Sequence, residues 1–517
     1  MPTISCPASG EAEPDQAETL RFLESPQGLA KDRPCRRIDT HCATIFLAGD
    51  RAWKLKRAVR YPYLDFSSPE QRRASLDAEL RLNRRTAPGL YRAVHPLIRT
   101  ASALAIGGDG PVVDWILEME RFPDGALLDE LAGQGALDPG MMQRLADRVH
   151  AFHDAAEKAI MLDGAARFRA VIDGNAESLR PFAALLGEQR IAELLDAQRK
   201  AWARHARLLD ARGRKGFVRH AHGDLHLANV ALIEGEPTPF DCLEFSGELA
   251  TIDTLYDLAF LLMDLWHRGL RAEANLVFNR YVDLSADEEG VRMLPLFLSV
   301  RATVRAHVLA ATAARRCDDG YVQHAETFLR LAAQLIAPGR PMLVAVAGLS
   351  GTGKSAVSRA LGAGLGPAPG ARILRSDVLR KRLARVPPEH ELPASLYTPL
   401  ASRAVYALLG DLAGRHLSNG AAVIADAVAA QPDQREAIAH AAAHAHVPFA
   451  GLWLEASEDV RLDRVCAREK DASDADAKVV IAQSDDHVPP PAGWRRLPAD
   501  APLADVVARA RNALGAA

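Results

Sequence analysis

The sequence predicts two domains that combine α/β and α+β architecture, and three observations lead to this prediction. The chain has 517 residues, more than a single hydrophobic core usually organises. In its first half, His222–Asn229 reads HGDLHLAN, and a turn must bring the Asp and the Asn of this Asp-x4-Asn spacing to one point. In its second half, Gly348–Ser355 reads GLSGTGKS between a buried-strand pattern and a helical pattern. Because the two motifs belong to different folds, we expect one in each domain.

The composition is that of an ordinary globular chain. Hydrophobic residues make up 48% and charged residues 25% of the sequence. The net charge is −3 and the pI is about 6.6, so no basic excess indicates a nucleic-acid partner. No pattern in the sequence predicts the oligomeric state.

Cysteine spacing and the N-terminus indicate the compartment. Six cysteines are scattered without a CxxC pair, which predicts reduced thiols and neither a disulfide framework nor a zinc knuckle. The first residues lack the basic-then-apolar order of a signal peptide. No apolar run approaching the ~20 residues of a membrane span is recognised. We therefore expect a cytoplasmic protein with no membrane partner.

The first domain opens with a hairpin. Residues 1–34, rich in Pro, Ser, Gly and acids, are predicted to be a flexible leader with a short helix at Ala17–Glu24. Two strands then follow, Thr44–Leu47 and Ala52–Lys56, around a Gly-Asp turn. Strand alternation puts Lys54 and Lys56 on one face. Ala52-x-Lys54 resembles the Ala-x-Lys of a kinase third strand, which implies that Lys54 binds phosphates, with Lys56 as the alternate. The simpler hypothesis is a solvated strand face.

A helix with clear end signals follows the hairpin. Ser68 is the predicted N-cap with Pro69 at the first helical position, and Pro88 ends the pattern. Glu79 lies in the middle of this helix, where it either pairs with Lys54 or is simply solvated.

An acid follows the Asp-x4-Asn loop at the end of an apolar run. Asp241 ends this run, and Glu244 comes three residues later. Further on, Ile252–Met263 is a strongly apolar pattern that predicts a buried helix. It contains Asp257, whose burial is costly without hydrogen bonds, so we expect Asp257 to bond back to the His222–Asn229 loop as structural support.

The His-Gly-Asp-x-His-x-x-Asn motif, the later acid and the Asp-x3-Asp-Leu-Ala helix together resemble the aminoglycoside phosphotransferase/choline kinase branch of the protein-kinase-like fold. The resemblance extends roughly over residues 37–337 and implies a bilobal domain, here taken as 35–337. It also implies ATP and Mg²⁺ as cofactors. The implied site comprises Asp224 as catalytic base, Asn229 and Asp241 as magnesium ligands, and Lys54 with Glu79 at the ATP phosphates.

The first domain departs from this family in three respects. No Gly-rich phosphate loop lies near the first strands, and Cys242-Leu243 replaces the usual glycine pattern after Asp241, where Glu244 is a further candidate to share the metal. No dense acidic cluster suits a polycationic substrate. These departures leave open a nucleotide fold without catalysis, and they disfavour an aminoglycoside acceptor.

The second domain begins after a Pro- and Gly-rich linker at 338–341 and is predicted to span 342–517. The order strand, glycine loop and helix predicts a P-loop NTPase fold with a parallel sheet flanked by helices. Glycines let backbone N–H groups turn toward phosphates, while Lys354 reaches the β- and γ-phosphates and Ser355 binds magnesium. The predicted nucleotide-binding residues are Gly348, Ser350, Gly351, Thr352, Gly353, Lys354 and Ser355.

Further acids and arginines complete this predicted site. Asp426 ends an apolar strand and is the expected magnesium-side carboxylate; Ala427 follows it, where AAA-type ATPases carry a glutamate. Asp377 ends another strand and is expected to bind or deprotonate an acceptor. Arg464 and Arg468 resemble lid arginines of shikimate-, gluconate- or adenylylsulfate-kinase-like enzymes, against the simpler hypothesis of surface arginines.

The order of the two domains resembles bacterial fusions of an aminoglycoside phosphotransferase-like domain with a P-loop kinase-like domain. We expect an ATP- and magnesium-dependent phosphotransferase that acts on hydroxyls of small molecules. The alternative is a nucleotide-sensing regulator in which an inactive kinase-like domain gates the P-loop domain. A motor-type or AAA ATPase is a third hypothesis, disfavoured by the residue after Asp426.

Overall fold

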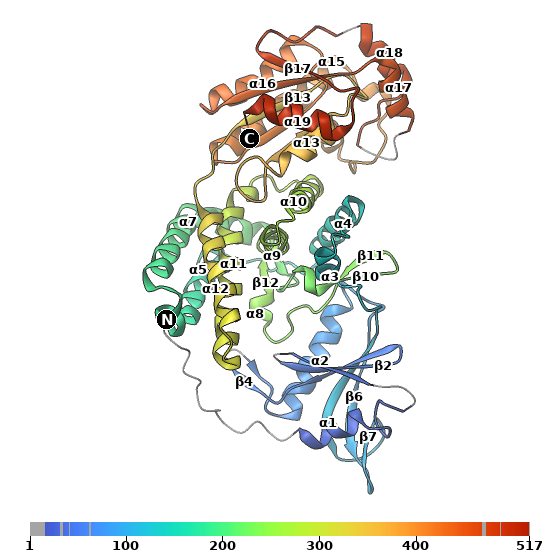
Figure 1. Ribbon diagram of the computed structural model, residues 1–517, viewed down its shortest axis with the longest axis vertical. Coiled ribbons are helices and arrows are strands. Elements are labelled where there is room, and N and C mark those ends of the chain that lie inside the picture. The colour runs from blue at the N-terminus through green and yellow to red at the C-terminus, as the bar shows by residue number, and fades with distance from the viewer. Residues whose placement is uncertain are drawn as a thin grey trace. The chain divides into compact units, whose positions relative to one another are not determined.

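The computed structural model describes residues 16–31, 35–40, 42–61, 64–467, 472–485 and 487–515 (Figure 1). The chain forms two compact units. The first unit is Met1–Leu261 with Thr303–Leu329, and the second is Leu262–Ala302 with Arg330–Ala517. Leu262–Ala302, placed in the first domain by the sequence analysis, thus groups with the P-loop half.

A six-stranded antiparallel sheet forms one part of the first unit, in the order β1-β2-β3-β8-β6-β7 (Figure 1). Its strands are β1 Arg36–Asp39, β2 Ala43–Ala48, β3 Arg51–Lys56, β6 Tyr91–Arg99, β7 Leu104–Ile106 and β8 Val112–Glu120, and β4 Arg60–Tyr61 with β5 Leu64–Asp65 forms a separate pair. Helix α2, Pro69–Asn83, packs on β6 and β8. Its N-terminus has the predicted Ser68 cap, reinforced by the Gln71 side-chain oxygen, which accepts a hydrogen bond from the Ser68 N–H.

The segment after residue 15 differs from the flexible leader that the sequence predicts. Helix α1, Ala17–Glu24, buries Leu23 completely in a cluster with Phe46 and Leu55 of the sheet. The Gln16 amide donates to Asp114 Oδ2 at 2.7 Å. Because this helix has an apolar face that the sheet covers, residues 16–31 are an integral part of the unit. Residues 1–15 and 32–34 lie outside the described residues.

The rest of the first unit is mainly helical and includes two short β-pairs, β9 with β12 and β10 with β11. Its helices are α3 Leu128–Gly133, α4 Pro139–Ala155, α5 Gly164–Leu179, α6 Ala183–Leu186, α7 Glu188–Lys215 and α8 Gly247–Ala250, with 3-10 turns η1 Arg180–Phe182 and η2 Leu227–Asn229. Its short strands are β9 Val218–His220, β10 Val230–Ile233, β11 Glu236–Pro239 and β12 Thr251–Asp253. Helices α9 Thr254–His267, α11 Leu294–Arg316 and α12 Asp319–Ile336 are divided between the units.

Two sequence expectations about this helical region need correction. Cys317, which separates α11 from α12 at a positive φ of 51°, is disulfide-bonded, whereas reduced thiols were expected throughout. Cys35, Cys42, Cys242 and Cys466 are free. In addition, one helical stretch among the described residues, Gly290–Arg316, is long and apolar enough to span a membrane, with a mean hydropathy of 1.3. Because 67% of its apolar window is buried, the stretch has the character of a core helix.

The second unit contains a five-stranded parallel sheet in the order β14-β15-β13-β16-β17 (Figure 1). Its strands are β13 Leu343–Ala347, β14 Arg372–Arg375, β15 Val423–Asp426, β16 Phe449–Glu455 and β17 Trp494–Pro498. Its further elements are α10 Arg271–Ser285, η3 Gly290–Met293, α13 Lys354–Gly362, α14 Ser376–Leu383, η4 Ala394–Leu396, α15 Pro399–Ser418, α16 Pro432–His444, α17 Glu458–Cys466, α18 Ala477–Asp485 and α19 Leu503–Leu514. Separate apolar clusters flank the sheet's two faces, and every residue of β13 is buried. The predicted fold class is confirmed.

A buried polar network explains why Leu262–Ala302 belongs to this unit. The Arg372 side chain, 1% exposed on edge strand β14, lies 2.6 Å from Asp283 and 2.8 Å from Glu288. Asn279 Oδ1 accepts from Arg372 Nη1 at 2.9 Å and from the Ile373 N–H at 2.7 Å. The α10 region therefore satisfies both the charge and the open backbone edge of β14.

The Glu288 carboxylate makes the stability of this unit sensitive to acid. Burial would raise the pKa of Glu288, but Arg372 and His416 hold it well below its usual value. A carboxylate with a depressed folded-state pKa contributes its stability above its unfolded pKa and loses it as the pH falls below that value. We expect the melting temperature of the wild type to exceed that of Glu288→Gln at about pH 6, with the difference shrinking toward about pH 3.5. A difference that stays constant over this range in calorimetry would contradict the assignment.

Candidate active sites

The first candidate site begins with a lysine–glutamate pair between β3 and α2. Lys54 Nζ lies 2.7 Å from Glu79 Oε1 and 2.7 Å from Asp241 Oδ1. The Glu79 side chain is completely buried. Burial opposes the charge of Lys54, yet Asp241 and Glu79 raise its pKa well above the usual value, so the ammonium stays protonated. The predicted partners Lys54 and Glu79 are thus brought together.

The Asp-x4-Asn loop follows β9 and is held by one buried acid. Asp257 accepts hydrogen bonds from the backbone N–H groups of His222, at 3.0 Å, and Gly223, at 2.9 Å. His153 Nε2 lies 3.0 Å from the same carboxylate. The predicted hydrogen bonds from the loop to Asp257 are confirmed. The groups that make them, together with His153, are buried and satisfy one another without water.

Within this loop, Asn229 faces Asp224. The Asn229 amide donates to both the backbone oxygen and Oδ2 of Asp224, each at 3.0 Å. His226 Nε2 lies 3.4 Å from Asp224 Oδ2. Burial would raise the pKa of Asp224, but His226 and His222 more than offset this effect and hold it below its usual value. The carboxylate is therefore ionised near neutral pH.

The β10–β11 hairpin brings Asp241 to the same place. Val230 pairs with Pro239, so Asn229 before β10 and Asp241 after β11 leave the hairpin at one end. Asp241 has a left-handed φ of 62°, and its N–H donates to Tyr91 Oη at 3.1 Å. Lys54 outweighs the effect of burial and lowers the pKa of Asp241.

The donor set of this site fits a magnesium ion with a nucleotide. Within the described residues, no group of three or more His, Cys, Asp or Glu side chains is arranged to hold a metal. The site offers two ionised carboxylates and an amide oxygen, from Asp224, Asp241 and Asn229. Magnesium is commonly held by one or two carboxylates, with phosphates and water as the remaining ligands.

Two charged residues that the sequence analysis names only as alternates, Lys56 and Glu244, pair with each other in this site. Lys56 Nζ lies 2.6 Å from Glu79 Oε2 and 2.5 Å from Glu244 Oε1. Glu244, considered from sequence as a residue that shares the metal, is instead bonded to Lys56. The i,i+2 spacing of the two lysines on one strand face was the available signal.

The second candidate site is the loop between β13 and α13. Gly348–Ser355 occupies the predicted strand-to-helix bend. Gly351 and Gly353 have φ values of 86° and 89°. A Cβ on Gly351 would lie 2.5 Å from the backbone oxygen of Arg461, so only glycine fits there. The Lys354 ammonium donates to Leu349 O at 3.0 Å and lies within the loop.

A buried carboxylate faces the start of this helix. Asp426 ends β15 opposite Val346 of β13 and is 4% exposed. Burial raises its pKa, against the opposing effects of Arg375, Lys354 and a hydrogen bond from the Ser355 hydroxyl. Asp426 Oδ2 accepts no hydrogen bond among the described residues, although Arg375 Nε lies 3.6 Å from it. A buried carboxylate oxygen that accepts no hydrogen bond, beside a hydroxyl, fits the magnesium side of a P-loop site.

The remaining predicted residues of the second site have different surroundings. Asp377 lies in the first turn of α14, directly after β14, and acts electrostatically on Asp426. Arg464 Nη2 donates to Ala499 O at 2.9 Å, and its Nη1 lies 3.9 Å from the position that a Cβ on Gly353 would take. Arg464 therefore borders the loop. Arg468 lies outside the described residues.

Curated relatives match the chain along most of its length. The uncharacterized protein Rv2004c of Mycobacterium tuberculosis is 30% identical over 458 residues, covering 86% of this chain and 88% of that protein. The uncharacterized protein Mb2027c of Mycobacterium bovis matches with the same identity and coverage. The chain belongs to the Rv2004c family.

This member of the Rv2004c family also matches, over residues 343–490, the family described as an AAA domain. The matched region begins on β13 and includes the P-loop and Asp426. Together with the geometry of the first unit, this match confirms the predicted order of a kinase-like half followed by a P-loop half.

Solved structures are similar to parts of this Rv2004c family member. A choline/ethanolamine kinase family protein from Mesorhizobium loti covers 62% of this chain and 98% of its own, at 14% identity and a TM-score of 0.37. A gluconokinase from Sinorhizobium meliloti covers 34% and 91%, at 22% identity and a TM-score of 0.26. The Mycobacterium tuberculosis APS kinase CysC, in complex with AMPPNP and APS, covers 35% and 99%, at 20% identity and a TM-score of 0.26.

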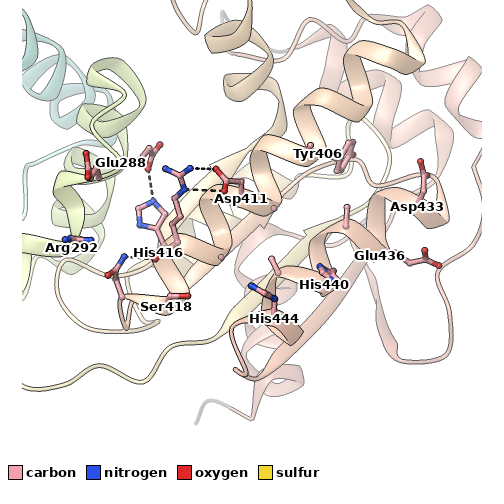
Figure 2. Close-up of a pocket in the computed structure, with 18 residues that line it drawn as sticks. Glu288, Arg292, Tyr406, Asp411, His416, Ser418, Asp433, Glu436, His440 and His444 are labelled. Carbon is pink, nitrogen blue, oxygen red and sulfur yellow. Dashed lines mark hydrogen bonds and ion pairs between the residues drawn. The ribbon is translucent and has the colours of Figure 1, made fainter.

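A surface cavity of about 960 Å³ in the second unit is lined mainly by residues of α15 and α16 (Figure 2). Ala and Gly residues form part of its lining, and His440 and His444 stack along α16. None of the predicted site residues lines it.

Proposed function

We propose that this protein is an ATP- and magnesium-dependent phosphotransferase with two nucleotide sites, which transfers the γ-phosphoryl group to hydroxyls of small molecules. The observation that carries the proposal is the convergence of Lys54, Asp241 and Asp224 in the first unit. A cation for phosphates, a carboxylate for magnesium and an ionised carboxylate for a hydroxyl proton are the parts that phosphoryl transfer needs.

In the first site, Asp224 takes the proton of the acceptor hydroxyl as its oxygen bonds to the γ-phosphorus, and the bond to the leaving ADP oxygen breaks. Lys54 binds the phosphates, and Asn229 and Asp241 hold the metal. Magnesium supplies positive charge that offsets the negative charge on the transferred group. Positioning and electrostatic stabilisation account for most of the catalysis, because little covalent chemistry falls to the protein.

In the second site, Lys354 and the loop N–H groups bind the phosphates, while Ser355 and Asp426 hold the metal. Asp377 binds or deprotonates an acceptor, and Arg464 with Arg468 neutralises the transferred group. Ala427 after Asp426 supplies no carboxylate to activate water. This supports transfer to an acceptor over hydrolysis, although the matching family is described as an AAA domain.

A nucleotide-sensing regulator is the second candidate function. It is favoured by the β1–β2 connection, residues 40–42, which contains no glycine and so no Gly-rich phosphate loop. In that case the first unit would bind nucleotide without turnover and gate the P-loop domain.

The two functions are separated by a metabolite-pool screen with γ-labelled ATP. Wild type, Asp224→Asn and Lys354→Ala are compared side by side. A labelled product lost only in Asp224→Asn assigns transfer to the first site, and one lost only in Lys354→Ala assigns it to the second. Nucleotide binding without any labelled product would overturn the transferase in favour of the regulator.

Lys354→Ala is also expected to weaken nucleotide binding at the second site by roughly 10–100-fold, because charge-assisted bonds to the phosphates are lost. Titration calorimetry on the full chain should then show one high-affinity site where the wild type shows two. Arg359→Ala, on the same helix, serves as the control and should retain both sites. Two unchanged sites in Lys354→Ala would contradict the assigned role.

A further inference from the structure

The first site contains a continuous chain of five alternating charges, whose three central members, Lys54, Glu79 and Lys56, are buried. Its order is Asp241, Lys54, Glu79, Lys56, Glu244, and each neighbouring pair lies 2.5–2.7 Å apart. One carboxylate oxygen of Glu79 lies beside each lysine: Oε1 accepts a hydrogen bond from Lys54, and Oε2 is in ion-pair contact with Lys56 without a hydrogen bond. The side chains of Glu79 and Lys56 are 0% and 3% exposed, so neither charge has water as a replacement partner.

The two lysines differ in what they reach. Lys54 is 11% exposed and contacts Asp241, whose side chain is 38% exposed. Lys56 is 3% exposed and contacts Glu244, whose side chain is 9% exposed. To bind phosphates, Lys54 must redirect part of its hydrogen bonding away from its present partners. Glu79 then needs a second cation, because an uncompensated buried carboxylate is strongly destabilising.

We propose that Lys56 and Glu244 are positioning residues for nucleotide binding: Lys56, neutralised by Glu244, holds Glu79 in place so that Lys54 is free to exchange Asp241 for phosphate. The proposal rests on the nucleotide site proposed above for the first unit. It assigns the second lysine of β3 a role distinct from that of Lys54.

The location of Glu244 supports this role. Glu244 follows Asp241 by three residues, so one segment supplies a carboxylate to each end of the chain of charges. The Ser75 hydroxyl donates to Glu244 Oε1 at 3.4 Å from α2, one turn before Glu79. The turn between the two acids is fixed by Asn83 Oδ1, which accepts from the Cys242 N–H at 2.8 Å. The arrangement therefore links the metal-side segment to the helix that carries Glu79.

The test uses the full chain with Lys354→Ala, so that ATP·Mg²⁺ binding reports on the first site. Lys56→Met is expected to weaken ATP affinity by about tenfold or more and to lower the melting temperature. Lys56→Met combined with Glu244→Gln is expected to recover much of the melting temperature, because no unpaired Glu244 charge remains, but to leave the affinity low, because Lys54 is then the sole cation at Glu79. Lys56→Arg keeps the charge and should retain most of the affinity.

Arg51→Met provides a matched control on the same strand. Its guanidinium pairs with Glu118, its side chain is 25% exposed, and strand alternation puts it on the face opposite Lys54 and Lys56, so ATP affinity should stay unchanged. If the double variant regains affinity together with stability, the pair is only structural and the proposal is overturned. The same holds if Lys56→Met binds ATP normally. If the Lys354→Ala parent binds no ATP, the nucleotide site proposed for the first unit is refuted, and this inference is refuted with it.

Discussion

Replacing Asp224 by Asn is expected to lower phosphoryl transfer at the first site by about 10²–10⁴-fold while nucleotide affinity stays within about twofold. Asn is nearly isosteric with Asp, so the bond from the Asn229 amide, 3.0 Å long in the wild type, can persist to the Asn oxygen. The variant loses only the negative charge that accepts the hydroxyl proton. Lys54 and Asp241, the proposed partners of the phosphates and the metal, are unchanged. The rate is measured with the acceptor identified in the labelled-ATP screen.

Asp154→Asn is a suitable control for this measurement. Its side chain is 74% exposed and lies outside the site, so rate and affinity should both match the wild type. If Asp224→Asn retains transfer within a few-fold, Asp224 is not the base. If it instead loses ATP binding, the residue supports the nucleotide and not the acceptor.

The parts of the fold that the sequence predicts well are those specified by local chemistry. The Ser68 cap, the β2–β3 turn at Gly49 and the Gly348–Ser355 loop each require particular residue types at fixed spacing. The same applies to Asp257, because an acid in an apolar helix has few alternatives to a buried hydrogen bond. In these cases a few neighbouring residues carry the whole signal.

The features that escaped prediction depend on residues far apart in the sequence. Lys56 and Glu244 are separated by 188 positions, and each taken alone is compatible with a solvated side chain. Helix α1 looked like part of a loose leader because its apolar face matters only once the sheet covers it. Ile252 and Asp253 of strand β12, Thr251–Asp253, were predicted to begin a helix, because this short strand pairs with β9 and has no period of its own.

The boundary of the P-loop unit shows the same limit. The linker signal at 338–341 is local, whereas the attachment of Leu262–Ala302 depends on one buried arginine and its partners. An arginine at the start of a strand carries no sequence mark of burial, and arginine is seldom fully buried unless paired. Arg372 at 1% exposure is therefore a feature that only the structure reveals.

Arg372→Met is accordingly expected to destabilise the second unit by about 3–5 kcal/mol, because it leaves Asp283 and Glu288 buried without their main cation. The two carboxylate side chains are 12% and 9% exposed, so water replaces the lost partner only in part. For a unit of this size, the loss corresponds to a fall in melting temperature of roughly 10 °C or more. Calorimetry on the full chain measures it directly.

Arg415→Met is the matched control, because Arg415 pairs with Asp411 on the same unit but is 69% exposed. Exposed pairs contribute about 0–1 kcal/mol, so its melting temperature should barely change. Equal and small effects of the two substitutions would show that the α10 region is not needed for the stability of β14.

If Arg372→Met has the large effect, a fragment that begins at Met342 lacks Asn279, Asp283 and Glu288 and is expected to be unstable for the same reason. Nucleotide binding by the P-loop site is then properly measured only when Leu262–Ala302 is retained.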